Sequence, residues 1–558
     1  MKKFNANVLE ISSLCILFAF LILIKSANKF LFFRDYAIIW EGAYRISLGQ
    51  IPYTDFGIPV GPVSFMAPAL AFKIFGATWR VLELTQLFLN GVILLTCYSI
   101  LKKISNNSFE IIFSLALLTF FYLTFLVSPW YNSTALLFFL VTIRLAFNKD
   151  GLSHALTGAC SALTILTKQD YGLICLFGSI FILVLRNLNE KSIIISKSWC
   201  VLQFFIGFSS VFLVLFAVVN LDDFLYWFNY GQGKYEKRRI PIEIFLNPRF
   251  LLLCFIVYIY IKTREIFWVV SALIISTSLL TSYTSGLIFT SYFDIVIFPG
   301  IVYRSYKNCY QPLKFMNVLL GLIFLCVVSF WKLPMVFQLS MVMCLLLISS
   351  FLKQEFFYLG GATILLAAII VREPIGGFGE ILTSVSKGLP GDAYFNYKNV
   401  TLDVIAAPKS LPAFSNTFAP KDTYDGIGQL KITLQESNLK SNSIKVLNLS
   451  ELTPLYAEMG LIPQRGLPLW FHTGVIFPKG EQMKLLNDIK VGKFDLIIYQ
   501  EAHDFNSPIF STLYLAIKES GHYKEPNFSS FKSPSGAFSS CGVRKCEDAN
   551  ISVFIKSD

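Results

Sequence analysis

Two aspartates, Asp35 and Asp55, are the side chains of this sequence that are best placed to do chemistry. Asp35 follows an apolar run over 11–24 that predicts a first membrane-spanning helix, so both aspartates fall in a loop beside the membrane. An ionisable group at such a boundary costs free energy unless it is solvated, paired or used, which makes both carboxylates functional candidates. A carboxylate here can act as a general base that takes the proton of a hydroxyl group.

Each of these carboxylates also has a structural alternative. Asp35 could cap a following helix or pair with Arg34, because short acidic side chains are favoured at helix starts. Asp55 could be a turn residue after Pro52, because aspartate is common in turns. The sequence leaves both roles open for both residues.

Cationic side chains in two further segments could hold a phosphate group. Lys168, followed by Gln169, lies at a break between two apolar runs, where it could contact phosphate or pair with Asp170. A basic run over 234–239 could attract an anionic lipid carrier or contact ordinary lipid headgroups. Guanidinium groups can bind phosphate oxygens with two hydrogen bonds. The candidate phosphate-binding residues of this run are Lys237, Arg238 and Arg239.

The segment between the two aspartates has the pattern of a short amphipathic helix that lies on the membrane surface. Aromatic and aliphatic residues recur at every fourth position from Tyr36 to Leu48. Glu41 can pair with Arg45 one turn later, and Gly49 can end the helix. We therefore expect Glu41 to be an ion-pair partner and not a catalytic group.

Composition identifies the class of protein that carries these residues. Hydrophobic residues make up 55% of the 558 positions and charged residues only 15%, against about 25% charged in soluble proteins. Mean hydropathy is +0.61. Repeated apolar runs of about 20 residues then predict about thirteen membrane-spanning helices. After the first helix we expect them near 81–101, 109–127, 131–147, 152–167, 170–186, 198–219, 249–262, 266–283, 286–303, 315–331, 334–352 and 355–371.

Basic residues between the spans place the N-terminus inside and everything after 371 outside. We expect a transmembrane domain over 1–371, with outer loops at 34–80 and 220–248, and an extracytoplasmic α/β domain over 372–558. Within the latter, Ile444–Leu449 and Phe494–Tyr499 read as buried strands and Glu451–Met459 as a helix. In bacteria this arrangement corresponds to the cytoplasmic (inner) membrane.

The C-terminal region carries two further features that could matter for function. His472 could contribute to an acceptor-binding loop or be a packed polar residue. Cys541 and Cys546 could close a small disulfide loop in an oxidising compartment or remain free thiols. The net charge of +12 does not indicate nucleic-acid binding, because lysine and arginine collect on the inner loops of membrane proteins.

The N-terminal part of the sequence resembles a known family of membrane enzymes. An acidic residue after the first span, an amphipathic juxtamembrane helix, and the stretches GQIPYTDF, GPVSF and FKIFG are similar to GT-C superfamily glycosyltransferases of the protein-mannosyltransferase and aminoarabinose-transferase type. The motifs cover roughly residues 10–190. This chain has a single Asp35 followed by Tyr36, where many relatives have two adjacent acidic residues.

The resemblance implies a polytopic membrane enzyme that takes a sugar from a polyprenyl-phosphate carrier on the outer face. Asp35 would be the general base, and Lys168 matches the lysine-containing turn of the family. Asp55 would orient the acceptor, assist Asp35 or bind a divalent metal, with no other cofactor implied. The acceptor would be a hydroxyl group of a lipid, glycan or protein.

The chemistry independently needs only one carboxylate. A phosphate-linked sugar already has a good leaving group, so no carboxylic acid must protonate it, unlike in ordinary glycoside hydrolysis. One base together with cations that hold the phosphate would suffice. The rival hypotheses are a flippase of lipid-linked sugars, which makes no bond, and a polysaccharide polymerase or ligase that uses a diphosphate-linked glycan.

Overall fold

The structure is a computed structural model that describes both ends of the chain. The described residues are 2–27, 30–31, 34–58, 60–104, 131–148, 150–169, 194–230, 404–436, 444–469, 471, 477–500, 508–526, 530–534 and 550–557, with scattered positions between 108 and 119 and between 172 and 183. The predicted spans from 249 to 371 lie outside them. So does most of the second outer loop.

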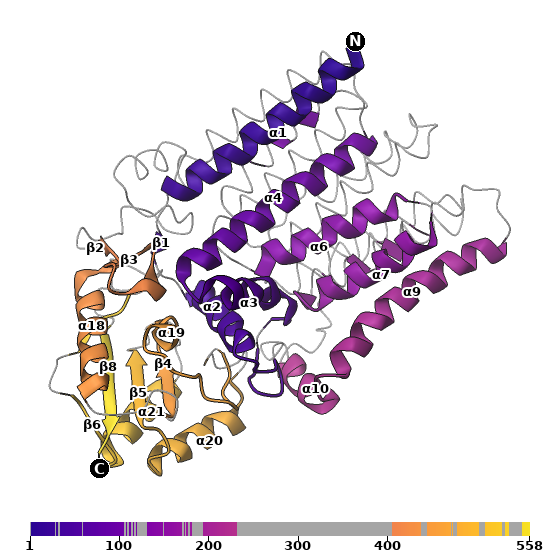
Figure 1. Ribbon diagram of the computed structural model, residues 1–558. Coiled ribbons are helices and arrows are strands. Elements are labelled where there is room, and N and C mark those ends of the chain that lie inside the picture. Colours follow the sequence, from indigo (N-terminus) through magenta and orange to yellow (C-terminus); the bar gives the residue numbers. More distant parts are fainter. Residues whose placement is uncertain are drawn as a thin grey trace, which may run out of the picture.

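The N-terminal region is helical, as predicted. Five long helices lie side by side, in the spatial order α1, α4, α6, α7, α9 (Figure 1). Their bounds are Lys2–Ala27 for α1, Trp79–Ile104 for α4, Tyr131–Ala146 for α6, Gly151–Ile165 for α7 and Ile194–Phe216 for α9. The N-terminus of α1 lies at the end of this layer away from the C-terminal region (Figure 1).

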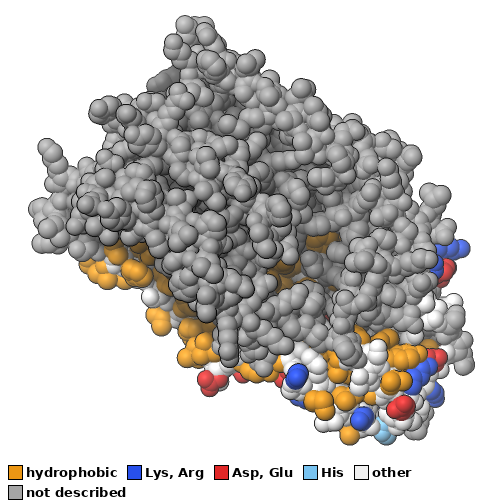
Figure 2. All heavy atoms as spheres, turned by 180° about the vertical axis from the view of Figure 1, so that it is seen from behind, with side chains coloured by type: hydrophobic (Ala, Val, Ile, Leu, Met, Phe, Trp, Pro, Cys, Tyr) orange, Lys and Arg blue, Asp and Glu red, His pale blue; other side chains and the backbone are white. Residues whose placement is uncertain are grey.

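Two of the described helices are long and apolar enough to cross a membrane: Trp79–Lys103 within α4 and Trp199–Phe216 within α9. Shorter apolar helices cover Asn7–Leu23, Val63–Phe75 and Ser133–Ala146. Figure 2 shows hydrophobic side chains on the visible surface of the helical layer, whereas charged side chains gather over the C-terminal region. The total of about thirteen spans stays a prediction.

Helices α7 and α9 pack at very short distance because each has a glycine at the contact. A Cβ atom on Gly158 would lie 1.9 Å from the carbonyl oxygen of Phe204. On Gly207 it would lie 1.8 Å from the carbonyl oxygen of Ala155. Small residues of this kind let helix backbones approach in membrane proteins.

Replacing Gly207 by valine is therefore expected to force the two helices apart. Overpacking of a close contact lowers the free energy of unfolding by about 1–3 kcal/mol, and here backbone atoms would have to move. Thermal unfolding of the purified protein in detergent measures the loss. Gly428→Ala is the control, because a Cβ there meets no atom within 4 Å; equal melting temperatures for both variants would contradict the packing argument.

Two shorter helices occupy the segment 34–80, which the sequence predicts to be the first outer loop. Helix α2 covers Arg34–Ser47, and Gly49 follows it with a positive φ of 82°. Helix α3 covers Val63–Phe75, directly after Pro62, and ends at Gly76 with a φ of 88°. Both positive φ values suit glycine, which has no Cβ. The helix end predicted at Gly49 is thus confirmed.

The C-terminal region is an α/β unit built on a five-stranded sheet. The strands are β4 (Val446–Leu449), β5 (Leu496–Gln500), β6 (Tyr523–Lys524), β7 (Phe531–Lys532) and β8 (Asn550–Lys556). Their order is β4-β5-β8-β6, with β7 also paired to β8. Among the described strands of this sheet only β4 and β5 are parallel, so their carboxyl ends lie at the same edge. The predicted strands at 444–449 and 494–499 are confirmed.

Alternate residues of the sheet pack on opposite faces, as strand geometry requires. Leu447, Ile497 and Phe554 join one core with α20 (Lys479–Lys490) and α21 (Pro508–Glu519). The other face packs with α18 (Lys421–Glu436) and α19 (Leu455–Glu458). The helix expected over 451–459 is shorter, because Pro454 precedes its first residue.

The core on the α18 face continues into the helical region. It includes Trp40 of α2, which is fully buried. A small second sheet, β1-β3-β2, also joins the two regions: β1 (Phe30–Leu31) lies after α1, and β2 (Val404–Ala406) and β3 (Thr417–Pro420) lie in the C-terminal region. The two regions are therefore packed against each other.

Candidate functional site

The loop between α2 and α3 contacts several segments that are distant in the sequence. Pro52 and Phe56 form an isolated bridge, which makes the segment between them a turn. Asp55 stabilises this turn by hydrogen bonds to Ile51. Its Oδ2 accepts the backbone N–H of Ile51 at 2.8 Å, and its own N–H donates to the Ile51 carbonyl at 2.8 Å. The structure thus gives Asp55 the turn role that the sequence allowed.

The C-terminal region holds the same loop. Arg465 Nη1 lies 3.3 Å from Asp55 Oδ1. The N–H of Gly466 donates to the Asp55 carbonyl at 2.6 Å, and the N–H of Leu469 donates to the Gly57 carbonyl at 2.9 Å. Asp55 therefore also joins the two regions. The sequence around Arg465 does not predict this contact.

Helix α10 (Leu221–Tyr230), which begins the second outer loop, packs on the other side of this turn. A Cβ atom on Gly57 would lie 2.5 Å from the ring of Trp227, so the loop can approach α10 only with a glycine there. The rings of Tyr53 and Phe224 meet edge to face at 5.1 Å. The start of the second outer loop thus touches the first.

Lys168 lies in the turn that follows α7, and this turn is bonded to the first outer loop. Gly61 donates its N–H to the Thr167 carbonyl at 3.1 Å, and Val63 donates to the Leu166 carbonyl at 3.2 Å. The Lys168 Nζ lies 5.6 Å from the centre of the Tyr131 ring, within cation–π range. Lys168 and its half-buried neighbour Gln169 are thus placed beside the loop that carries Asp55.

Asp35 is the second residue of α2 and lies in its first turn. Its side chain lies outside the described part of the structure, so its role as the base stays a prediction. All residues from 36 to 45 are buried, so α2 is enclosed and does not lie open on a surface as its amphipathic pattern predicts. The C-terminal region covers its polar face.

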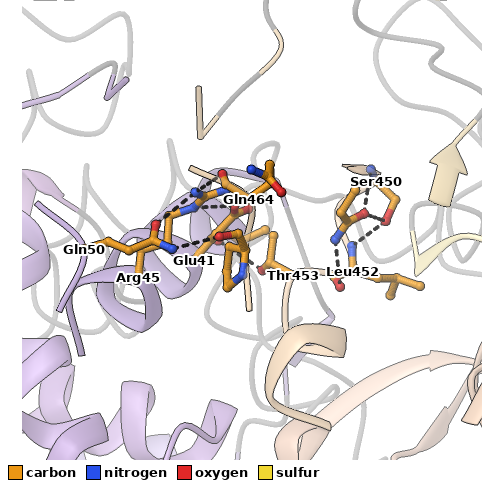
Figure 3. Close-up of polar contacts among 10 residues, drawn as sticks. Glu41, Arg45, Gln50, Ser450, Leu452, Thr453 and Gln464 are labelled. Atoms are coloured by element: carbon orange, nitrogen blue, oxygen red, sulfur yellow. Dashed lines mark hydrogen bonds and ion pairs between the residues drawn. The ribbon is translucent and has the colours of Figure 1, made fainter. Parts of the chain in front are cut away.

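Arg45 links the polar face of α2 to the C-terminal region, and the exposed fraction of this residue is 1%. Its Nε and Nη2 donate to Glu41 Oε1 at 2.8 and 2.7 Å, which confirms the predicted pair. Its Nη1 donates to the carbonyl of Gln464 at 2.8 Å and to Gln50 Oε1 at 3.2 Å. Figure 3 shows these four residues joined, with Thr453 beside them; Thr453 Oγ1 donates to the Ala37 carbonyl at 3.1 Å.

Burial under the C-terminal region raises the pKa of Glu41, and the Arg45 guanidinium opposes this shift. Burial, with the nearby Glu41 carboxylate, also raises the pKa of Tyr456. The sequence showed the i,i+4 spacing of Glu41 and Arg45. It carried no signal for the partners at 456 and 464.

Several predicted residues lie outside the described part of the chain. They are Lys237, Arg238, Arg239, His472, Cys541 and Cys546. The basic run begins four residues after the end of α10. Among the residues that the structure describes, no three His, Cys, Asp or Glu side chains lie close enough together to hold a metal ion.

No protein-family model matches the sequence, and no curated protein matches it. The structure, however, is similar to a crystal structure of ArnT from Cupriavidus metallidurans bound to undecaprenyl phosphate. The sequence identity is 11%, the TM-score is 0.50, and the match covers 98% of this chain and 97% of that one. The chain has an ArnT-like fold. The expected order of a helical N-terminal region and a C-terminal α/β region is thereby confirmed.

Proposed function

We propose that the protein is a membrane glycosyltransferase of the bacterial inner membrane. It transfers a sugar from a polyprenyl-phosphate donor to an acceptor hydroxyl group on the extracytoplasmic face. The ArnT-like fold over 98% of the chain carries this proposal. The convergence of the first outer loop, the Lys168 turn and the C-terminal region supports the location of the site.

In the proposed reaction Asp35 accepts the proton of the acceptor hydroxyl group. The acceptor oxygen forms a bond to the anomeric carbon of the sugar, with inversion. The bond from that carbon to the phosphate oxygen breaks, and the polyprenyl phosphate leaves with its electron pair. Lys168, Gln169 and the cations Lys237, Arg238 and Arg239 hold the phosphate, and His472 contacts the acceptor.

Asp55 has a proposed role beside Asp35, as a residue that orients the acceptor, assists the base or binds a divalent metal. Its contacts with Ile51 and Arg465 support the first of these, because they hold the carboxylate in the loop between α2 and α3. The exposed fraction of its side chain is 14%, so one edge remains accessible.

The test is sugar transfer by the purified protein in detergent. A panel of radiolabelled polyprenyl-phosphate sugars is supplied with a crude envelope extract. Transfer of label from the donor to an extract component supports a transferase. Movement of the intact carrier across liposomes without a new bond identifies a flippase, and transfer only from diphosphate-linked glycans identifies a polymerase or ligase.

Replacing Lys168 by methionine is expected to raise the KM for the donor by about 10- to 150-fold, because a hydrogen bond to a charged group contributes about 1.5–3 kcal/mol. The KM for the acceptor should hardly change. Lys168→Arg should retain part of the donor affinity. Lys73→Met, at an exposed position on α3, is the control; a donor KM that is equal in Lys168→Met and Lys73→Met would remove Lys168 from the site.

A further inference from the structure

A cavity of about 40 Å³ lies between α2 and the C-terminal region, at the carboxyl ends of the parallel strands β4 and β5. Ala37, Ile38 and Glu41 line it from α2, and Ser450, Glu451 and Gln500 line it from the strand ends. Crevices outside the carboxyl ends of parallel strands, and interfaces between domains, are preferred positions for ligands. We propose that this cavity binds a hydroxyl group of a saccharide acceptor, an inference that rests on the proposed transferase function.

One wall of the cavity carries a hydrogen-bond donor for which the described residues supply no acceptor. Gln500 is 2% exposed, and its Oε1 accepts the backbone N–H of Glu451 at 3.0 Å. This bond fixes the orientation of the side-chain amide, so the Nε2 group remains as a donor for a further hydrogen bond. Among the described residues no partner is found for Gln500 Nε2. An unsatisfied buried donor costs about 1–3 kcal/mol, so a ligand that accepts from it gains free energy.

The opposite wall carries a matching acceptor. Arg45 uses only Oε1 of Glu41 for its two bonds, and within the described part of the chain Glu41 Oε2 has no hydrogen-bond partner. A hydroxyl group can accept from an amide and donate to a carboxylate at the same time. Gln500 and Glu41 therefore suit a hydroxyl group.

The remaining lining selects against the other substrate of the reaction. Glu41 and Glu451 are both acidic, and the described lining contains no lysine or arginine that could hold the phosphate of a polyprenyl-phosphate donor. Phe471 and Phe510 add aromatic surface, which is common in pockets that orient ligands with a few polar groups. A neutral, hydroxyl-rich molecule fits this lining better than an anion.

The cavity is also close to the proposed base. Asp35 precedes Ala37 and Ile38 on the same helix, which corresponds to about 3–4.5 Å along the axis at 1.5 Å per residue. The cavity therefore begins within one helical turn of the residue proposed as the base.

The test separates the acceptor from the donor. Gln500→Glu keeps an oxygen that accepts from Glu451 and replaces the Nε2 donor, whereas Gln500→Met removes both groups. Each variant should raise the acceptor KM by about 10-fold, the effect of one lost hydrogen bond of about 1.4 kcal/mol, and leave the donor KM unchanged. Gln500→Met also leaves the Glu451 N–H without its acceptor, so its melting temperature should fall, and the unchanged donor KM then shows that the rest of the site is intact. Gln429→Glu and Gln429→Met, at an exposed position on α18, are matched controls. An acceptor KM in the Gln500 variants equal to that of the controls would overturn the inference.

A binding measurement distinguishes failure of this inference from failure of the proposed function. Hydrogen exchange of the full-length protein is followed over 446–451 and 496–500 with a panel of methyl glycosides as probes. Slower exchange in the wild type, lost in Gln500→Glu, supports the saccharide site even if no sugar is transferred. Unchanged exchange with every glycoside, together with transfer that is independent of Gln500, would refute the site and leave the transferase standing.

Discussion

Replacing Asp35 by asparagine is expected to lower the rate of sugar transfer by about 100- to 10,000-fold, the range that general base catalysis contributes. Asparagine has almost the same shape but cannot accept the proton of the acceptor hydroxyl group. The KM for the donor should change little, because the donor phosphate is held elsewhere. The measurement is single-turnover transfer from the polyprenyl-phosphate sugar that the wild type accepts.

Two controls make this result specific. The melting temperature of Asp35→Asn should equal that of the wild type, which excludes a folding defect. Asp35→Glu should recover part of the rate, because it restores a carboxylate at a slightly different position. A rate for Asp35→Asn close to that of the wild type would remove Asp35 from the role of base.

Asp55 can be compared in the same assay. Asp55→Asn weakens the pair with Arg465 but keeps an oxygen for the N–H of Ile51, so a purely structural role predicts a small loss. Arg465→Ala removes the same pair without touching Asp55. A much larger loss of rate in Asp55→Asn than in Arg465→Ala would show that the Asp55 carboxylate acts on the substrates.

The second large effect is expected at Arg45. Arg45→Met leaves the buried Glu41 carboxylate without its cation and the Gln464 carbonyl without its donor. Breaking a buried pair in this way costs about 3–5 kcal/mol, because an uncompensated charge stays buried. We expect a clearly lower melting temperature, faster hydrogen exchange over 461–466 and loss of transfer, since α2 carries Asp35.

A double variant and a surface control refine this prediction. Glu41→Met combined with Arg45→Met should be more stable than Arg45→Met alone, because the unpaired charge is gone. Lys493→Met breaks a pair with Asp488 in which the lysine side chain is 40% exposed, and it should change stability by less than about 1 kcal/mol. If Arg45→Met were no less stable than Lys493→Met, Arg45 would not join the two regions.

Local sequence was sufficient to predict those helices, helix ends and strands that depend on a short range of residues. The length of the apolar runs predicted the helices that became α1, α4, α6, α7 and α9, because crossing hydrocarbon requires a helix of a certain length. Gly49 marked the end of α2, because its positive φ value suits a residue without Cβ. The buried strands β4 and β5 followed from their apolar stretches.

The candidate residues divide in the same way. Residue types and the resemblance to GT-C transferases predicted Asp35, Asp55 and Lys168, and the structure places the last two around one loop. Their roles stay predictions. The sequence pointed to the basic run at 234–239 and to His472, which lie outside the described residues and also stay predictions.

Only the tertiary structure decided what covers α2 and what lines the cavity beside it. The repeat of apolar residues shows that the helix has a polar face, but water, lipid headgroups and protein are equally compatible with that pattern. Arg45 meets Gln464 across 419 positions of the chain. Glu41 and Gln500 line the same cavity from different regions. Such contacts depend on how the helical region and the C-terminal region pack against each other. They join single residues from distant segments, so they produce no repeating pattern in the sequence of either segment.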